Sequence, residues 1–310
     1  MSRIAAIDCG TNSIRLLIVE HTESGVRELD RRMVIVRLGE GIDQTGEFSA
    51  AALERTFAAI DDFVKILSNY EIDGIRFVAT SASRDAKNRA VFEAGVASRL
   101  GVQPEIISGD EEARLSFLGA TSELLAKGAT GPFLVIDIGG GSTEFVIGQD
   151  SPASARSVNI GCVRMTERHL QTDPPSGAEI EAATADIDSA IAAALAVVPA
   201  GQAVEVIGLA GSVTTVAAMA LGLPKYDRNQ IHGTRLSREQ IISACDRLLH
   251  MTRSQRSELP FMHPGRIDVI GAGALVLKQC IAALPQENLL VSEHDILDGI
   301  AADLYQRMTS

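Results

Sequence analysis

The sequence predicts an α/β protein built from two similar domains. Three observations point to this fold class: the chain has 310 residues, apolar strand-like runs alternate with amphipathic helical segments, and one strand–turn–strand pattern occurs twice. Domains usually contain about 100–200 residues, so this length suggests two of them. Strands that alternate with helices are typical of mainly parallel sheets, here with hairpins at the edges.

After the first copy of the strand–turn–strand pattern, the first half of the chain contains three predicted strands and three predicted helices. Leu53, Phe57, Ile60 and Val64 follow helical spacing, and Ser49 is the expected N-cap of that helix. Gly101 is expected to end the next helix, because glycine readily adopts the left-handed conformation that closes helices. In chain order the expected elements are strand 33–38, helix 49–67, strand 75–79, helix 86–100, strand 105–107 and helix 110–125.

The second half has the same alternation. Ser237 with Gln240 fits a capping box at the start of one of its helices. We expect strands at 133–138, 144–147, 157–160, 204–209 and 289–292, and helices at 177–197, 212–221, 238–250, 267–284 and 295–308. The predicted boundary lies between 126 and 132, which gives domains 1–126 and 127–310. The helix 295–310 is free to pack back on the first domain.

Composition narrows the function classes. Hydrophobic residues make up 46% and charged residues 22%, ordinary values that exclude a disordered chain. No apolar run approaches the roughly 18 residues that span a bilayer, and the start lacks a signal peptide, so we expect a cytoplasmic protein without a membrane partner. The net charge of −12 argues against nucleic acid as a partner. A polyanion would need a local basic pocket and a divalent cation.

The repeated pattern carries the first candidate site. Ile, Asp, Gly and Ser recur at an offset of 129 residues (137 minus 8), in segments 6–18 and 135–147. Each copy has a strand, a Gly/Ser/Thr turn with an Asp before it, and a second strand. One copy alone is also compatible with an ordinary β-hairpin. Two copies favour phosphate loops, in which backbone N–H groups and hydroxyls face an anion and Asp8 or Asp137 holds a hydrated Mg²⁺ (or Mn²⁺).

Three further segments contain side chains suited to phosphate chemistry. Glu111 and Glu112 stand in the first turn of a predicted helix, where the helix dipole alone also explains them. Since neighbouring helical residues point about 100° apart, only one of these glutamates can face a ligand, and it would accept a proton from water. Arg84 follows a predicted strand and stands at the start of a helix. It is expected either to contact phosphate or to lie at a solvated helix start. Gly211 and Ser212 form a weaker candidate of the same kind.

These motifs, in this order, resemble the exopolyphosphatase/guanosine pentaphosphate phosphohydrolase (Ppx/GppA) family of the actin-like ATPase superfamily. The resemblance covers essentially the whole chain and rests on segments 7–16, 79–86, 108–115 and 135–144. It implies two tandem ribonuclease-H-like domains with the active site in the cleft between them. It implies hydrolysis of the terminal phosphate of polyphosphate, or of guanosine pentaphosphate, with a divalent cation, and it is compatible with a homodimer.

The resemblance also assigns residues. The glutamate before Ala-Arg is the family's base and matches Glu112. The acidic residues of the second loop match Asp137, expected to bind the metal, and Glu144, expected to bind the metal and to take part in catalysis. The expected phosphate-binding residues are Gly10, Thr11, Asn12, Ser13, Arg15, Arg84, Gly139, Gly140, Gly141, Ser142, Thr143, Gly211 and Ser212; the expected metal ligands are Asp8, Asp137 and Glu144.

Two other function classes remain open at this point. The first is a kinase or nucleotide-dependent switch of the same superfamily, which the Glu-Glu-Ala-Arg element disfavours. The second is a non-catalytic protein that binds guanosine tetraphosphate in the stringent response. Longer family members carry further helical C-terminal domains, whereas this sequence corresponds to the two-domain core. We therefore expect short polyphosphate chains to be favoured, with nucleoside triphosphates as further candidate substrates.

Overall fold

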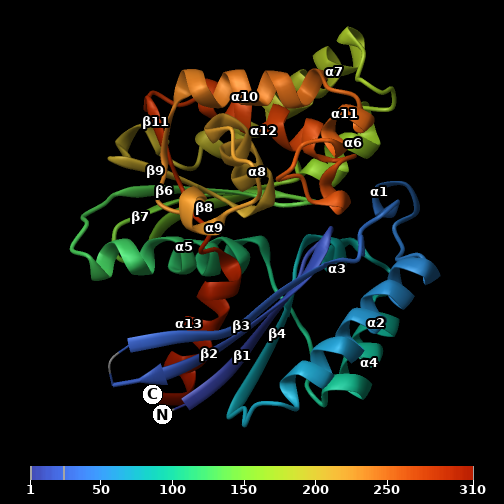
Figure 1. Ribbon diagram of the computed structural model, residues 1–310, viewed down its shortest axis with the longest axis vertical. Helices are drawn as coiled ribbons and strands as arrows, with labels where there is room; N and C mark the ends of the chain where they lie inside the picture. Colours follow the sequence, from blue (N-terminus) through green and yellow to red (C-terminus); the bar gives the residue numbers. More distant parts are fainter. Residues whose placement is uncertain (1, 24, 310) are drawn as a thin grey trace. The chain divides into compact units, whose positions relative to one another are not determined.

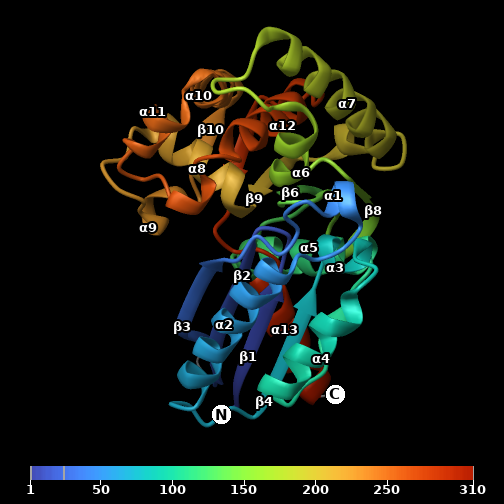
Figure 2. The same cartoon turned by 90° about the vertical axis from the view of Figure 1, so that its right-hand side faces the viewer.

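The computed structural model describes residues 2–23 and 25–309, which form two compact units (Figures 1 and 2). Unit 1 contains the chain up to Gly119 together with the segment from Ile296 onward, and unit 2 contains Ala120–Asp295. The boundary between Gly119 and Ala120 falls within a single helix, Gly109–Ala126, so this helix belongs partly to each unit. The sequence-based boundary at 126/127 lies just after this helix, and the last helix belongs to unit 1.

Unit 1 has one five-stranded sheet and five helices among the described residues. The strands are β1 (Ser2–Cys9), β2 (Ser13–Thr22), β3 (Gly25–Ile35), β4 (Gly74–Ala79) and β5 (Glu105–Ile106). The helices are α1 (Ile42–Thr45), α2 (Ala50–Leu67), α3 (Ser81–Asp85), α4 (Arg89–Leu100) and α13 (Ile296–Thr309), and α5 (Gly109–Ala126) begins here.

The unit 1 sheet has the order β3-β2-β1-β4-β5. β1 pairs antiparallel with β2 and parallel with β4, so the first hairpin forms one edge and the crossover strands form the other. Residues alternate along β1: Ala5 and Ile7 pack against α2 and α4, whereas Ile4 and Ala6 pack against α13 and α5. Figure 1 shows α2 and α4 on one side of the sheet and α13 on the other.

Unit 2 has a six-stranded sheet of order β10-β11-β9-β6-β7-β8. Its strands are β6 (Phe133–Ile138), β7 (Thr143–Gly148), β8 (Pro152–Val158), β9 (Glu205–Leu209), β10 (Arg235–Ser237) and β11 (Asn288–Val291). Its helices are α6 (Cys162–His169), α7 (Gly177–Leu195), α8 (Ala210–Leu221), α9 (Arg228–Ile231), α10 (Arg238–His250), α11 (Arg253–Ser257) and α12 (Ile270–Ala282), with 3₁₀ turns at Ala200–Gln202 and Pro264–Arg266.

The two sheets share the same central arrangement. β6 pairs antiparallel with β7 and parallel with β9, as β1 does with β2 and β4. On β6, Leu134, Ile136 and Ile138 belong to one core with residues of α7, α8, α10 and α12, helices that lie together beyond one face of the sheet in Figure 2. The prediction of two α/β halves is therefore confirmed, whereas the expectation of mainly parallel sheets was wrong: two of the four strand pairings in the unit 1 sheet and three of the five in the unit 2 sheet are antiparallel.

Most predicted elements are present with small shifts of their ends, but two strands begin earlier than expected: β3 (Gly25–Ile35) replaces 33–38, and β8 (Pro152–Val158) replaces 157–160. The caps are confirmed: Ser49 accepts the N–H of Ala52, Ser237 and Gln240 form the capping box, and Gly101 has φ 72°. The expected helix 86–100 was wrong at its start, since the chain makes the short α3 and begins α4 only at Arg89. Helix α6 was not predicted. None of the helices in the described part of the chain is long and apolar enough to span a bilayer.

Candidate active site

The two repeated hairpins close their turns with the same backbone hydrogen bond. In unit 1 the N–H of Gly10 donates to the carbonyl oxygen of Ser13 at 2.9 Å, and in unit 2 the N–H of Gly139 donates to that of Ser142 at 3.0 Å. The donors and the acceptors are each 129 positions apart, the offset found in the sequence. The repeat in sequence is therefore a repeat in backbone geometry.

In both loops the carbonyl oxygens accept hydrogen bonds from backbone N–H groups of a neighbouring segment. In unit 1, Gly39 donates its N–H to the carbonyl of Thr11 at 2.9 Å, and Val36 donates to that of Asn12 at 3.0 Å. In unit 2 the same role falls to the start of α6, whose N–H groups at positions 161–164 donate to the carbonyls of residues 139–141. Gly161 must be glycine, since a Cβ there would lie 2.3 Å from the backbone of Gly140.

Each loop also has two consecutive N–H groups that the described backbone does not use. Among the described residues, no backbone carbonyl accepts the N–H of Thr11 or Asn12 in unit 1, or that of Gly140 or Gly141 in unit 2. The buried Thr11 Oγ1 and Asn12 Oδ1 also have no hydrogen-bond partner in that part of the chain. Successive backbone N–H groups in a turn commonly bind an anion, so these two pairs of donors indicate a place for one.

Asp8 is neutralised within its own hairpin. It lies opposite Arg15 across the β1–β2 ladder, and its Oδ2 accepts hydrogen bonds from Arg15 Nε at 3.0 Å and Nη2 at 2.5 Å. The side chain of Asp8 is 4% exposed and that of Arg15 is 19% exposed. This ion pair uses the guanidinium that the sequence assigned to phosphate, and it occupies one oxygen of an expected metal ligand.

The equivalent cross-strand pair in unit 2 consists of two carboxylates. Asp137 lies opposite Glu144 across the β6–β7 ladder, and both are buried. Ser157 on β8 donates a 2.7 Å hydrogen bond to Glu144 Oε1. The buried Arg164 of α6 adds a positive charge behind the loop, where its Nε donates to the carbonyl of Gly141 at 2.8 Å.

The donor set of unit 2 fits a hard divalent cation. Mg²⁺ prefers oxygen ligands and usually takes one or two carboxylates together with phosphate oxygens. Two carboxylates that face each other across a ladder next to a loop of N–H donors meet this requirement. By contrast, the Thr143 hydroxyl donates to the carbonyl of Ile160 at 2.8 Å, so it is directed into the protein.

Glu112 is a buried carboxylate beside the first hairpin. Its Oε2 is 2.6 Å from Arg84 Nη1, and the same nitrogen donates to the carbonyl of Ile107 at 3.1 Å. Burial raises the pKa of Glu112, the Arg84 cation and a hydrogen bond from Thr80 oppose that rise, and the charge of Asp8 adds to it. The structure thus brings Asp8, Thr80, Arg84 and Glu112 together in unit 1.

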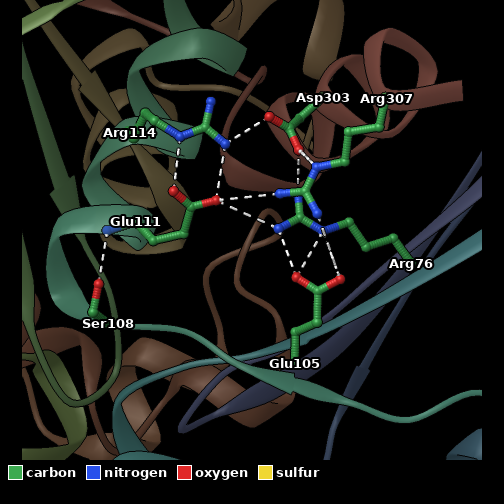
Figure 3. Close-up of polar contacts among 7 residues, drawn as sticks. All are labelled: Arg76, Glu105, Ser108, Glu111, Arg114, Asp303 and Arg307. Atoms are coloured by element: carbon green, nitrogen blue, oxygen red, sulfur yellow. Dashed lines mark hydrogen bonds and ion pairs between the residues drawn. The ribbon is translucent and has the colours of Figure 1, made fainter. Parts of the chain in front are cut away.

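Glu111 has a different set of partners, which Figure 3 shows. Its carboxylate accepts hydrogen bonds from Arg114 at 2.7 and 2.8 Å and lies 3.4 Å from Arg76. The bonds from Arg114, and then those from Arg76, lower the pKa of Glu111. Arg76 and Arg114 also bind Asp303 of α13, so this side of α5 is part of an ion-pair network.

The segment with Gly211 and Ser212 is closely packed within unit 2. A Cβ on Gly211 would lie 1.9 Å from the guanidinium of Arg266, and one on Gly273 would lie 2.4 Å from Ser212 Oγ. Ala210 before them has φ 67°, an uncommon left-handed conformation for a residue with a side chain. These residues therefore lie beside Arg266, which the sequence did not single out.

Arg164 and Arg266 are the cations that the sequence-based interpretation missed. Arg164 belongs to a helix whose first N–H groups bind a loop more than 20 residues earlier. Arg266 follows His263 in a short 3₁₀ turn and bonds Thr215 Oγ1 at 3.3 Å. Neither position lies in a phosphate-loop motif, and the only available signal was an arginine that follows a Gly or Pro turn.

Comparisons with known proteins agree with this architecture. A family model described as the Ppx/GppA phosphatase family matches residues 17–308. Exopolyphosphatase 2 of Mycobacterium tuberculosis is 45% identical over 98% of this chain and 99% of its own length. The guanosine-5'-triphosphate,3'-diphosphate pyrophosphatase of Pseudoalteromonas atlantica is 38% identical over 60% of this chain and 37% of its own.

A solved structure of an exopolyphosphatase-like protein superimposes with a TM-score of 0.94 at 45% identity, covering 100% of this chain and 99% of that one. The predicted fold class, two tandem ribonuclease-H-like domains of the actin-like ATPase superfamily, is thereby confirmed. The model match, the full-length relative and the superposition all agree: the chain belongs to the Ppx/GppA phosphatase family, a family of hydrolases.

Proposed function

We propose that this protein is an exopolyphosphatase. It removes the terminal phosphate of inorganic polyphosphate with a divalent cation, releases orthophosphate and favours short chains. The observation that carries this proposal is the pair of matching loops, each presenting consecutive backbone N–H groups, with a buried glutamate beside the first. Such donors bind successive phosphoryl groups whatever else the substrate carries.

The proposed division of roles follows the side chains. Asp137 and Glu144 would hold Mg²⁺ or Mn²⁺, which supplies charge neutralisation for phosphate oxygens. The N–H groups of Thr11, Gly140 and Gly141 would bind those oxygens. The location of both loops in one cleft between the domains stays a prediction of the family resemblance.

Glu112 would act as the general base. A water oxygen attacks the terminal phosphorus, one water proton passes to the Glu112 carboxylate, and the bond from phosphorus to the bridging oxygen breaks. Orthophosphate and a chain one phosphate shorter leave. Arg84 donates a hydrogen bond to Oε2 of Glu112. We therefore assign the role of proton acceptor to the other carboxylate oxygen, Oε1.

The test is release of orthophosphate from purified polyphosphates of defined length, with Mg²⁺ but with neither nucleotide nor acceptor. Steady release, fastest on short chains, supports the proposal. Release that requires an acceptor would identify a kinase instead. Tight binding of guanosine tetraphosphate without any phosphate release would identify a non-catalytic binding protein.

A second candidate function is removal of the 5'-terminal phosphate from guanosine pentaphosphate. It is favoured by the 38% identical relative, whose name describes that substrate. The same loops and base would serve, because the cleaved phosphoanhydride is chemically alike. A higher kcat/KM on guanosine pentaphosphate than on every polyphosphate tested would make this the principal activity, and nucleoside triphosphates belong in the same assay.

A further inference from the structure

Three side chains that belong to neither phosphate loop meet in unit 2. Glu123 lies near the end of α5, His232 directly follows α9, and His294 follows β11. One ligand atom from each lies within 4.8 Å of the other two. Glu123 Oε2 is 2.8 Å from His232 Nε2 and 3.2 Å from His294 Nδ1, and the two imidazole centroids are 4.6 Å apart.

We propose that Glu123, His232 and His294 form a binding site for a divalent transition-metal ion of the Zn²⁺ type. Zinc binds imidazole nitrogen and carboxylate oxygen at about 2.0–2.2 Å, so tetrahedral ligand atoms are about 3.3 Å from one another. The distances from Glu123 Oε2 to His232 Nε2 (2.8 Å) and to His294 Nδ1 (3.2 Å) require only small side-chain movements. Two nitrogen ligands favour Zn²⁺ and disfavour Mg²⁺, which prefers oxygen.

The backbone around the histidines is held in place before any ion binds. Gly233 donates its N–H to the carbonyl of Val291 at 2.8 Å, and Val291 donates to that of Thr234 at 2.9 Å. These bonds join the segment after His232 to the segment before His294. The N–H of His294 also bonds Ser292 Oγ at 3.0 Å. The ligands therefore come from a fixed scaffold, which reduces the entropy lost on binding.

The site is open enough for water to complete the coordination. The side chains of Glu123, His232 and His294 are 33%, 30% and 34% exposed. Lys127 contacts the other carboxylate oxygen of Glu123, and its side chain is 69% exposed, so it is free to turn into solvent. Its positive charge opposes an incoming cation. Removing that charge should therefore strengthen metal binding.

His232 must change its hydrogen bonding when the ion binds. The backbone N–H of Glu293 donates to His232 Nδ1 at 3.1 Å, so the neutral ring carries its proton on Nε2, toward Glu123. A neutral imidazole that binds zinc through Nε2 carries its proton on Nδ1 instead. Zinc binding therefore breaks the bond from Glu293, and the amide signal of Glu293 reports it.

The experiment is calorimetric titration of the full chain with Zn²⁺ in the presence of Mg²⁺, with heteronuclear NMR of the Glu293 amide. We expect one zinc per chain, an unfolding midpoint that rises with zinc, and a shift of the Glu293 signal. His232→Gln and His294→Gln should each weaken zinc binding at least tenfold, and Lys127→Gln should strengthen it severalfold. Far-ultraviolet circular dichroism confirms that each variant is folded.

The matched control is His169→Gln. His169 Nε2 lies 2.8 Å from Asp186 Oδ2, the same kind of contact without a second histidine, so this variant should bind zinc as the wild type does. The proposal is overturned if no zinc binds, if His169→Gln weakens binding as much as the cluster variants do, or if zinc binds without moving the Glu293 signal. None of these measurements depends on phosphatase activity, so failure here leaves the proposed function untouched.

Discussion

The hairpin of unit 1 and the hairpin of unit 2 have the same backbone but opposite charge at one position. Arg15 in the first corresponds to Glu144 in the second, 129 residues later, and each faces the aspartate of the neighbouring strand. Asp8 is therefore half of an ion pair, whereas Asp137 faces a second carboxylate. The residue opposite the aspartate thus differs in charge between two hairpins of the same ladder register, and only the second hairpin is the one proposed to hold a cation.

This difference suggests a division of labour. Unit 1 adds Glu112 beside its neutralised hairpin, where burial raises the pKa of the carboxyl. Unit 2 adds Arg164, which fixes the glycine loop from behind. Proton transfer would then belong to unit 1 and cation binding to unit 2. Substitutions in the two hairpins should have separable effects.

The largest expected effect is at the base. Glu112→Gln should lower kcat by about 10²–10⁴-fold, because an amide cannot accept the proton of water. The Mg²⁺ concentration for half-maximal rate should not change. Since the pKa of Glu112 is raised above 4.5, the acid limb of the wild-type rate profile should lie above that pH and disappear in the variant. Rates close to wild type would remove Glu112 from the mechanism.

The second effect concerns the Asp8–Arg15 ion pair of the unit 1 hairpin. Arg15→Met leaves Asp8 buried without its guanidinium, and breaking a buried pair costs about 3–5 kcal/mol. The thermal unfolding midpoint should fall, and the double variant Asp8→Asn/Arg15→Met should recover much of the loss. If the double variant is no more stable than Arg15→Met, the pairing does not explain the destabilisation.

The third effect tests the assignment of the cation. Asp137→Asn should raise the half-saturating Mg²⁺ concentration at least about tenfold, since even groups behind the ligands commonly change metal affinity by 10–100-fold. Asp8→Asn is the matched change in the other hairpin and should alter that concentration much less. Equal shifts in both variants would contradict the division of labour.

The smallest effect separates Glu111 from Glu112. Glu111→Gln should retain most activity but lose about 1 kcal/mol of stability at neutral pH, because it removes charge-assisted bonds at a partly exposed site. The pKa of Glu111 is lowered in the folded state, so its contribution is present above the unfolded value of about 4.5 and is lost as pH falls through the folded pKa. The difference in the free energy of unfolding between the wild type and Glu111→Gln, measured across pH 3–7, tests this expectation.

The sequence predicted what depends on local chemistry. The caps at Ser49 and Ser237, the left-handed Gly101 and the repeated turn follow from residues within a few positions of one another. Helix α6 did not, because its first N–H groups bind carbonyls of a distant loop. The same holds for the contact between Arg84 and Glu112, which are 28 residues apart. By contrast, helix geometry alone predicted that Glu111 and Glu112 point in different directions, and their separate partners confirm it.

The return of α13 to unit 1 has a consequence for synthesis. Asp303 on this helix bonds Arg76 and Arg114, which precede it by 227 and 189 residues. All of unit 2 leaves the ribosome before α13 does, and domains begin to fold as they emerge. One face of the unit 1 sheet, which carries Ile4 and Leu17, therefore has only α5 against it until the rest of the protein has been made. The unit that starts first is the one completed last.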